Sequence, residues 1–408
     1  MQFRLIYDRM AYMKKRKIAE ELRQLAHEFP VVSIYGPRQS GKTTLAKATF
    51  PEKPWVSLED PDVNALARND PRAFLNAYPT GAVFDEIQKI PELFSYLQGY
   101  VDMDPRAVGK YILTGSHQAR LKQGVAQSLA GRTAILTLLP YSIAELREGG
   151  EAIPDNVFEL IWKGFYPRLH ENRIRPSSFY PSYVATYLER DLPALLEVRN
   201  RATFLSFLFL LASRTGQILN LAALGAEIGV TAATISAWVS ALEESSLVFK
   251  LQGWSRNATA QVTKSPKIYF TDTGLAAWLA KIRTPRAAAE SALRGGLYEN
   301  FVLMELRKEA LARNIPAEFR FFRSKTGDEV DIVVDLGDRI VPVEVKSSTT
   351  FRTDFLHGLD AFRRLVPLAE IAAGAIAFNG HPAAKETNGV MLANPLDEDF
   401  ATRILGEA

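Results

Sequence analysis

Short apolar runs and helically spaced apolar residues alternate along the first third of the chain. The runs lie at Val31–Tyr35, Trp55–Leu58, Gly81–Phe84 and Lys110–Leu113. From Lys14 to Glu28, by contrast, apolar residues recur at helical spacing. Short apolar strands separated by helices are typical of a parallel sheet with both faces covered. The pattern therefore predicts an α/β fold in this region.

The residues that follow the first apolar run form a phosphate-binding motif. They read Gly-Pro-Arg-Gln-Ser-Gly-Lys-Thr-Thr and fit G-x-x-x-x-G-K-[ST] at every fixed position. In this motif backbone N–H groups surround phosphate oxygens, the lysine reaches the β- and γ-phosphates, and the hydroxyl lies on Mg²⁺. A chance Gly-rich turn is the alternative, but the strand before the motif and the helix formers after it favour binding. We expect the following residues to bind ATP: Gly36, Pro37, Arg38, Gln39, Ser40, Gly41, Lys42, Thr43 and Thr44.

Two adjacent acids, Asp85 and Glu86, end the third apolar run. In P-loop ATPases the first acid at such a strand end holds Mg²⁺, and the second polarises the attacking water. We therefore assign Asp85 and Thr43 to Mg²⁺, and Glu86 to catalysis together with Lys42. A solvated pair of acids at a strand end is the alternative.

Three further residues are candidates for contacts with the γ-phosphate. The fourth run ends in Thr114 and Ser116, and a hydroxyl at that position can lie near the γ-phosphate. Alternatively, the two residues form a turn that caps the next helix. Arg132 precedes the apolar stretch Ala134–Leu139, where it can reach the γ-phosphate of a neighbouring subunit and offset charge in the transition state. A surface arginine in a local salt bridge is the alternative for Arg132.

A stretch in the second half of the chain has the pattern of a helix-turn-helix followed by a two-stranded wing. Leu221–Ile228 is a short helix, Gly229–Thr231 a turn with a capping threonine, and Ala232–Glu244 a second helix. The runs Leu247–Leu251 and Pro266–Thr271 predict the strands of the wing. A winged helix is often used on DNA, but it can also serve only to pack or to bridge subunits.

The charges in this region favour contacts with the DNA backbone over base recognition. No Lys or Arg lies between Thr231 and Ser246, so the second helix offers no cation to base edges. Cations are found in and beside the loop between the two strands. The predicted DNA-binding residues are Arg256, Lys264 and Lys267. A second basic group, which is either a solvated face or a phosphate-binding patch, consists of Arg168, Arg173 and Arg175.

Acids and a lysine recur around a predicted hairpin near the C-terminal end. Two strands flank the turn Leu336–Arg339, and strand alternation puts Glu344 and Lys346 on one face. Asp331 on the partner strand and Glu299 on a helix can approach them. This arrangement resembles the PD-(D/E)XK nuclease fold, in which the acids bind Mg²⁺ and the lysine steadies the attacking water or the phosphate. The resemblance implies a second metal site at these four residues; a buried charge network that does not cut is the alternative.

The ordered motifs also resemble a specific family of prokaryotic AAA+ ATPases, in which the ATPase module is fused to a conserved C-terminal domain of unknown function. The motifs that carry this resemblance are the phosphate loop, Phe84–Gln88, Ile112–Ser116, Ser128–Arg132, Tyr187–Asp191, Ser265–Leu275, and Glu329–Asp331 with Glu344–Lys346. The resemblance covers roughly residues 14 to 364 and implies ATP binding, but it does not fix the cellular role.

Together the patterns predict three domains. An AAA+ P-loop ATPase domain with a parallel sheet occupies residues 1–149, from about residue 14, and a Gly- and Pro-rich linker, Gly149–Pro154, follows it. A helical and winged-helix region occupies residues 150–283. An α/β PD-(D/E)XK nuclease-like domain occupies residues 284–408.

Composition excludes several classes of protein. The 408 residues contain no Cys, which excludes disulfides and Cys-based zinc sites and fits a reducing compartment. Lys and Arg number 49 and Asp and Glu 46, so the net charge of +3 does not by itself favour nucleic acid. The N-terminal region has no signal-peptide core, and the run Phe204–Ala212 is too short to span a bilayer. We expect a cytoplasmic protein with no membrane association.

Three functions of different classes fit these features. The first, which we take as the leading hypothesis, is an ATP-driven enzyme that forms a homo-oligomeric ring or arc and remodels DNA, with ATP and Mg²⁺ as cofactors. The second is an ATP-switched module that binds DNA or protein without moving it. The third is an ATP-gated, metal-dependent nuclease. DNA-stimulated ATP turnover favours the first, ATP binding with little turnover the second, and metal-dependent cutting the third.

Overall fold

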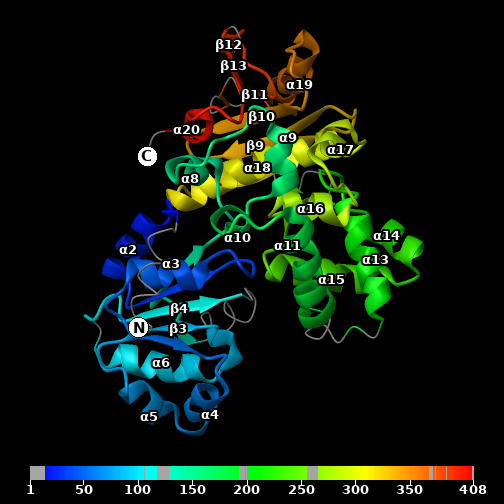
Figure 1. Cartoon of the computed structure of the whole chain (residues 1–408). Coiled ribbons are helices and arrows are strands. Elements are labelled where there is room, and N and C mark those ends of the chain that lie inside the picture. Colours follow the sequence, from blue (N-terminus) through cyan, green and yellow to red (C-terminus); the bar gives the residue numbers. More distant parts are fainter. Residues whose placement is uncertain are drawn as a thin grey trace. The chain divides into compact units, whose positions relative to one another are not determined.

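The structure is a computed structural model of the whole chain, and its elements are labelled in Figure 1. It describes residues 14–104, 106–116, 128–192, 198, 200–254, 265–366, 371–372, 374–382 and 384–406, with the backbone only at 190 and 191. Contacts divide the chain into two compact units, each described by itself below. The first unit runs to Tyr141 and includes two short later segments, 244–246 and 311–313; the second contains the remainder.

The first unit alternates strands and helices, as the sequence predicted. Its strands are β1 (Val31–Tyr35), β2 (Trp55–Ser57), β3 (Ala82–Asp85), β4 (Tyr111–Gly115) and β5 (Thr133–Thr137). Its helices are α2 (Ala19–Glu28), α3 (Lys42–Thr49), α4 (Pro61–Asn69), α5 (Pro71–Asn76), the 3-10 helix η1 (Ile87–Lys89) and α6 (Leu93–Asp102).

The five strands form one parallel sheet in the order β2-β3-β4-β1-β5. Strand β4 thus lies between β1, which leads into the phosphate-binding motif, and β3, which ends in the acids. Because all strands run in the same direction, their carboxyl ends meet at one edge of the sheet. That edge therefore carries the motif, the acids and the end of β4.

Helices cover both faces of this sheet, as Figure 1 shows for α3 on one side of β3 and β4 and α6 on the other. On one face α2 and α3 bury Leu22 and Leu45 against Val32 and Ile112. On the other face α5 and α6 bury side chains such as Phe74 against Phe84 and its neighbours. The apolar runs are therefore buried on both sides, which explains why they show no alternation of apolar and polar residues.

The second unit begins with helices and ends in a mixed α/β region. Its helices are α8 (Ile143–Glu148), α9 (Val157–Lys163), α10 (Pro167–Glu171), α11 (Pro176–Tyr183), the π-helix η2 (Val184–Asp191), α13 (Arg201–Ala212), α14 (Leu221–Ile228), α15 (Ala232–Glu244), α16 (Thr273–Leu279), α17 (Pro285–Glu290), α18 (Arg294–Ala312), the 3-10 helix η3 (Thr353–Leu356), α19 (His357–Leu365) and α20 (Phe400–Leu405). Its strands are β6 (Val248–Gly253), β7 (Lys267–Phe270), β8 (Glu318–Arg323), β9 (Glu329–Asp335), β10 (Ile340–Lys346), β11 (Ala375–Phe378), β12 (Glu386–Thr387) and β13 (Val390–Ala393).

These eight strands form a single mixed sheet in the order β12-β13-β11-β10-β9-β8-β6-β7. The predicted hairpin is present, because β9 and β10 pair antiparallel with Asp335 opposite Ile340. Helix α19 packs Leu359 and Phe362 on one face of the sheet. The strand pair predicted as a wing, β6 and β7, joins this sheet through the parallel pairing of β6 with β8. The segments predicted as a wing and as a nuclease-like domain therefore share one sheet.

The boundary between the two units lies earlier than the linker predicted at Gly149–Pro154. Helix α8, which we expected to close the ATPase domain, belongs to the second unit. The backbone N–H of Ile143 donates to Glu305 Oε2 of α18 at 2.8 Å, and Arg147 donates to the carbonyl of Leu396 at 2.8 Å. These contacts, which the sequence pattern did not reveal, hold α8 within the second unit.

The two helices of the predicted helix-turn-helix are α14 and α15, and the bend between them is 108°. This angle lies within the range of helix-turn-helix motifs. Gly229 ends α14 with φ 79°, and the Thr231 hydroxyl accepts from Thr234 N near the start of α15. Within the described residues no single helix is long and apolar enough to span a membrane. Only α14 and α15 taken together, as a bent pair, have the length and composition of such a span.

Candidate functional site

The phosphate-binding motif connects β1 to α3 with backbone angles that favour glycine. Gly36 has φ 153°, and a Cβ there would lie 2.0 Å from the carbonyl oxygen of Leu138, so only glycine fits. Gly41, with φ 95°, allows the loop to turn directly into α3. The Ser40 hydroxyl is buried and has no hydrogen-bond partner. A buried orphan hydroxyl inside such a loop indicates a place for a ligand oxygen.

Lys42 is 5% exposed and points back into the loop. Its Nζ donates to the carbonyl oxygens of Gly36 and Pro37, both at 3.0 Å. Burial lowers the pKa of Lys42, and the carboxylates of Glu86 and Asp85 only partly oppose this effect. Phosphate oxygens would offset the cost of burying this ammonium group better than two neutral carbonyls do.

Asp85 accepts hydrogen bonds from two hydroxyls that come from different elements. Thr43 Oγ1, at the start of α3, donates to Asp85 Oδ1 at 2.8 Å. Thr114 Oγ1, from β4, donates to the same carboxylate oxygen. A hydroxyl and a carboxylate beside the phosphate loop are the oxygen ligands that Mg²⁺ prefers, so the residues present fit the ion.

Two side chains hold Glu86 in place. One comes from η1, which follows β3, and the other comes directly after β4. Ser116 Oγ donates to Glu86 Oε2 at 2.9 Å, and Gln88 Nε2 donates to the same oxygen. Burial acts to raise the pKa of Glu86, but the Lys42 ammonium and these two hydrogen bonds outweigh it, so the pKa is lowered. Glu86 also has a left-handed backbone, with φ 58°. Non-glycine residues with such strained angles cluster at functional sites.

The structure thus separates the two hydroxyls that the sequence left as alternatives. Thr114 bonds to the predicted Mg²⁺ ligand Asp85, and Ser116 bonds to the predicted catalytic acid Glu86. Gln88 was not assigned a role from the sequence. The signal that could have found it is its spacing from Glu86. Gln88 stands two positions later, and the one-turn helix η1 brings its side chain back to the Glu86 carboxylate.

The other predicted loop residues lie in the same turn. Gln39 has φ 65°, and Pro37 lies two residues before it. Thr44 lies in the first turn of α3. Arg38 extends outward, with its guanidinium 3.8 Å from Glu59 and its side chain 32% exposed.

Arg132 lies at the opposite edge of the sheet from the phosphate loop. Its carbonyl accepts from Val31 N at 3.2 Å, at the start of β1, whereas the loop follows the end of β1. The length of a five-residue strand, about 16 Å, separates the two edges. Its guanidinium forms two hydrogen bonds with Asp102, at 2.5 and 3.1 Å. Within one chain Arg132 is therefore a salt-bridge partner of Asp102 and does not reach the nucleotide site.

The four residues of the predicted nuclease-like cluster do come together at one end of the second sheet. Asp331 Oδ2 accepts from Val345 N at 2.9 Å, and Lys346 pairs with Glu344. Burial raises the pKa of Glu299 to about 7, and burial with the Asp331 carboxylate raises the pKa of Glu344 to about 8. The four side chains therefore share one electrostatic environment, as their spacing predicted.

Lys267 belongs to this cluster, and its prediction as a DNA-binding residue is wrong. Its side chain is 4% exposed, and Nζ lies 2.9 Å from Glu299 Oε1, 2.5 Å from Glu329 Oε1 and 3.6 Å from Asp331 Oδ1. Burial acts to lower the pKa of Lys267, but the carboxylates, led by Glu299, outweigh it and raise the pKa well above its usual value. A buried lysine that neutralises acids cannot contact a DNA phosphate.

The second metal site is not supported by this arrangement. In the part of the chain that the structure describes, no group of three or more His, Asp or Glu side chains is placed to hold a metal ion. The reason is visible in the cluster, because the ammonium group of Lys267 lies where the acids converge. Sequence reasoning missed this pairing, since Lys267 and Glu329 carry no metal-site pattern.

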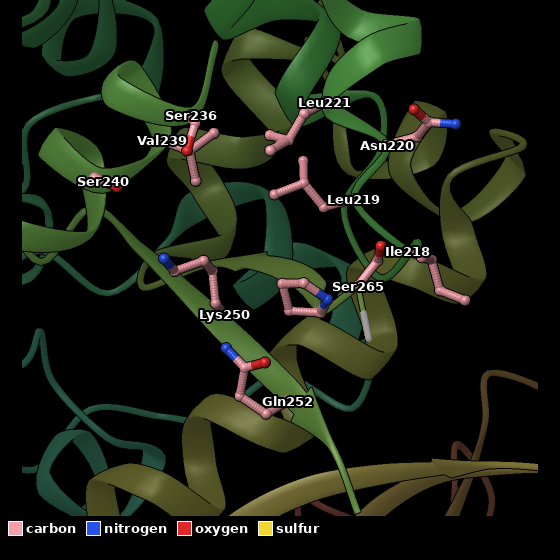
Figure 2. A pocket seen from close by; sticks show the side chains of 11 residues that line it. Ile218, Leu219, Asn220, Leu221, Ser236, Val239, Ser240, Lys250, Gln252 and Ser265 are labelled. Atoms are coloured by element: carbon pink, nitrogen blue, oxygen red, sulfur yellow. The ribbon is translucent and has the colours of Figure 1, made fainter. Parts of the chain in front are cut away.

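The other predicted DNA-binding residues, Arg256 and Lys264, lie outside the described residues. A pocket of about 570 Å³ lies between β6, α15 and the segment before α14. Figure 2 shows Lys250 and Gln252 on β6 and Val239 on α15 around it. Lys250 pairs with Glu243 at 2.7 Å, so its charge is already balanced.

The basic group on α10 and on the connection between α10 and α11, in contrast, is open to solvent. Arg168, Arg173 and Arg175 are all exposed, and none forms an ion pair with an acid among the described residues. An exposed group of like charges without counter-charges raises the local positive potential of the surface.

The parallel sheet, the loop around Lys42 and the acids at the end of β3 define a P-loop ATPase domain. The profile of the family described as "AAA domain" matches residues 28–147. Two families described as domains of unknown function, DUF8612 and DUF4143, match residues 154–286 and 294–396. The three matched ranges follow one another along the chain without overlap.

Two curated relatives are uncharacterised proteins of Mycobacterium tuberculosis and Mycobacterium bovis. Each is 30% identical over 342 residues, which cover 83% of this chain and 75% of the relative. The chain therefore belongs to the same family of AAA-domain proteins as these mycobacterial relatives.

Two solved structures are similar to this chain at lower sequence identity. A Walker-type ATPase of Pyrococcus abyssi is 14% identical, with a TM-score of 0.45 over 65% of this chain and 96% of the other. The Thermotoga maritima RuvB Holliday junction branch migration motor is 19% identical, with a TM-score of 0.29 over 57% of this chain and 88% of the other.

Proposed function

We propose that this chain hydrolyses ATP with the help of Mg²⁺. The observation that carries the proposal is the convergence of Lys42, Thr43 and Asp85 with the acid Glu86 at one edge of the sheet. The Thr43 and Thr114 hydroxyls meet on Asp85, and Ser116 fixes Glu86. Such preorganisation lowers the cost of assembling the site when ATP binds.

Each side chain has a distinct task in this proposal. Lys42 releases its two carbonyl partners and donates to the β- and γ-phosphates. Thr43 and Asp85 would hold Mg²⁺, which neutralises charge that develops on the phosphate oxygens. Glu86 accepts a hydrogen bond from the attacking water and orients it in line with the γ-phosphate, and its lowered pKa keeps it ionised.

The experiment that tests this proposal is phosphate release from ATP by the full chain. We expect release in the presence of Mg²⁺ and none after the ion is removed with EDTA. Equal release under both conditions would contradict the assignment of Thr43 and Asp85 to the metal.

We further propose that the ATPase domains assemble into a ring or an open arc, with Arg132 of one subunit at the nucleotide of the next. The position of Arg132 supports this, because it lies at the edge of the sheet opposite its own nucleotide site. A ring of identical subunits joined head to tail brings opposite edges of neighbouring domains together. Asp102 would then hold the guanidinium in place until the interface forms.

Arg132→Ala is expected to slow turnover about tenfold and to leave ATP affinity nearly unchanged. The guanidinium would lie at the neighbouring subunit's γ-phosphate and offset charge in the transition state, so its loss slows turnover more than it weakens ATP binding. The measurement is kcat and ATP affinity, with sedimentation of the protein with and without ATP. Asp102→Asn is the matched control, since it breaks the same salt bridge but should keep turnover. A monomer with full activity would rule out the role across subunits.

For the second unit we propose binding to the DNA backbone, so that ATP turnover remodels DNA. The support is the helix-turn-helix angle of α14 and α15 together with the exposed basic group Arg168, Arg173 and Arg175. Stimulation of ATP turnover by DNA would favour this function over a module that only switches. The exposed face of α15 is small and partly acidic and carries no Lys or Arg, which favours backbone contacts elsewhere without sequence preference.

Charge reversal should weaken DNA binding to a similar extent on unrelated sequences. We expect this for Arg168→Glu with Arg173→Glu and Arg175→Glu, and separately for Arg256→Glu with Lys264→Glu. For every phosphate that is no longer neutralised, the slope of log affinity against log salt should become flatter by about 0.9 on duplex DNA. Arg286→Glu is the control, because Arg286 is exposed but already paired with Glu290. Binding that matches wild type at low salt in both variants would refute the proposal.

A further inference from the structure

The acidic cluster of the second unit contains its own cation. Lys267 reaches it from β7, the outer strand of the sheet, and contacts carboxylates from two other elements. Glu299 comes from α18, and Glu329 and Asp331 come from β9. The three Nζ-to-oxygen distances of 2.9, 2.5 and 3.6 Å place one ammonium group among three acids.

Other groups around Lys267 fix its position. Tyr269, which is fully buried two residues further along β7, donates its hydroxyl to Glu299 Oε1. The ammonium group also lies over the ring of Phe321, 5.5 Å from the ring centroid. The lysine is therefore held by packing, a hydrogen-bonded acid and ion pairs together, and has little freedom to leave the cluster.

The far side of the cluster still has more acid than base. Asp331 Oδ2 is turned toward β10, where it accepts from Val345 N at 2.9 Å. Glu344 pairs with Lys346 through one carboxylate oxygen, while its other oxygen is buried without a hydrogen-bond partner. The Glu344 side chain is only 9% exposed. An unpartnered oxygen on a buried acid beside Asp331 indicates an affinity for one more positive charge.

We propose that Lys267 takes the place of a divalent metal ion in this cluster, and that removal of its charge turns the cluster into a cation site. With Lys267 present, the acids are bridged and β7 is tied to β9 and α18. Without it, Glu299, Asp331 and Glu344 would repel one another in a buried space, and a divalent ion with oxygen ligands would relieve that repulsion. A bound divalent ion and the Lys267 ammonium group would thus each neutralise the same excess of negative charge.

Thermal unfolding of the full chain with and without Mn²⁺, in the absence of nucleotide, tests this proposal. For wild type, any change of the unfolding temperature caused by Mn²⁺ should be the same as for Asp331→Asn. Lys267→Met should lower the unfolding temperature by roughly 10 °C, since buried acids lose their partner, and Mn²⁺ should restore much of it. Mn²⁺ binding followed by electron paramagnetic resonance should be at least tenfold tighter in Lys267→Met than in wild type.

Two variants separate this effect from general destabilisation and from the ATP site. Lys267→Arg keeps the charge and should show no response to Mn²⁺. Lys267→Met combined with Asp331→Asn should lose the response, although the ATP site is unchanged. The proposal is overturned if Lys267→Met gains nothing from Mn²⁺. It is also overturned if wild type is stabilised by Mn²⁺ and Asp331→Asn alone abolishes that effect, a comparison that holds even if Lys267→Met fails to fold.

Discussion

Glu86→Gln is expected to bind ATP about as tightly as wild type and to hydrolyse it at least ~100-fold more slowly. A positioned general base contributes about 10²–10⁴ to the rate, and the amide cannot polarise the attacking water. The amide has the same shape and can still accept from Ser116 through its oxygen. It also tolerates the left-handed backbone at this position about as well as the acid does, so we expect no loss of folding.

This prediction is checked by single-turnover phosphate release together with equilibrium binding of ATP. Glu92→Gln is the matched control, because Glu92 is an exposed acid of the same domain, and its one ion pair among the described residues is with Arg68. The two variants differ in whether the acid faces the nucleotide loop. If Glu86→Gln hydrolysed ATP at the wild-type rate, another group would have to activate the water, and the role assigned to Glu86 would be wrong.

Lys42→Ala is expected to reduce ATP affinity by at least ~100-fold. Two charge-assisted hydrogen bonds to phosphate oxygens are lost, and each contributes about 1.5–3 kcal/mol. The loop itself should persist, because the two carbonyls that Lys42 contacts, those of Gly36 and Pro37, are left accessible to water. Turnover should fall with affinity, since the lysine also stabilises the transferring phosphoryl group.

Isothermal titration with ATP and Mg²⁺ measures this effect. Lys47→Ala provides the control, since Lys47 lies on the same helix α3 but its ammonium group stacks on the ring of Trp55, 3.4 Å from the ring centroid. We expect Lys47→Ala to bind ATP normally. Equal affinity in Lys42→Ala and wild type would mean that the loop does not bind the β- and γ-phosphates.

Local pattern was sufficient to predict which side chains meet at the carboxyl edge of the first sheet. The loop residues follow one another in the chain, and a parallel sheet brings strand ends to one edge whatever the order of its strands. The partners of Asp85 and Glu86 therefore came from positions that the sequence had already marked, Thr43, Thr114 and Ser116. Gln88 was missed because its contact depends on a one-turn helix that has no pattern of its own.

Charge pattern was a poorer guide in the second unit. Lys267 was predicted to contact DNA because it stands in a local group of cations, yet β7 carries it into the sheet. Whether a lysine on a short strand faces solvent or a neighbouring strand depends on what pairs beside it. The parallel pairing of β6 with β8 joins residues almost 70 positions apart, and no local signal encodes it.

The sequence by itself determined the class of the first domain, the elements of the helix-turn-helix and the convergence of Glu299, Asp331, Glu344 and Lys346. Each of these depends on spacing within a strand, a helix or a loop, which fixes side-chain direction locally. Only the tertiary structure decided that the last two predicted domains share one sheet and that Lys267 fills their acidic cluster. The physical reason is that a buried acid takes whichever cation the fold brings within about 4 Å, and that distance is set by strand pairing rather than by chain order.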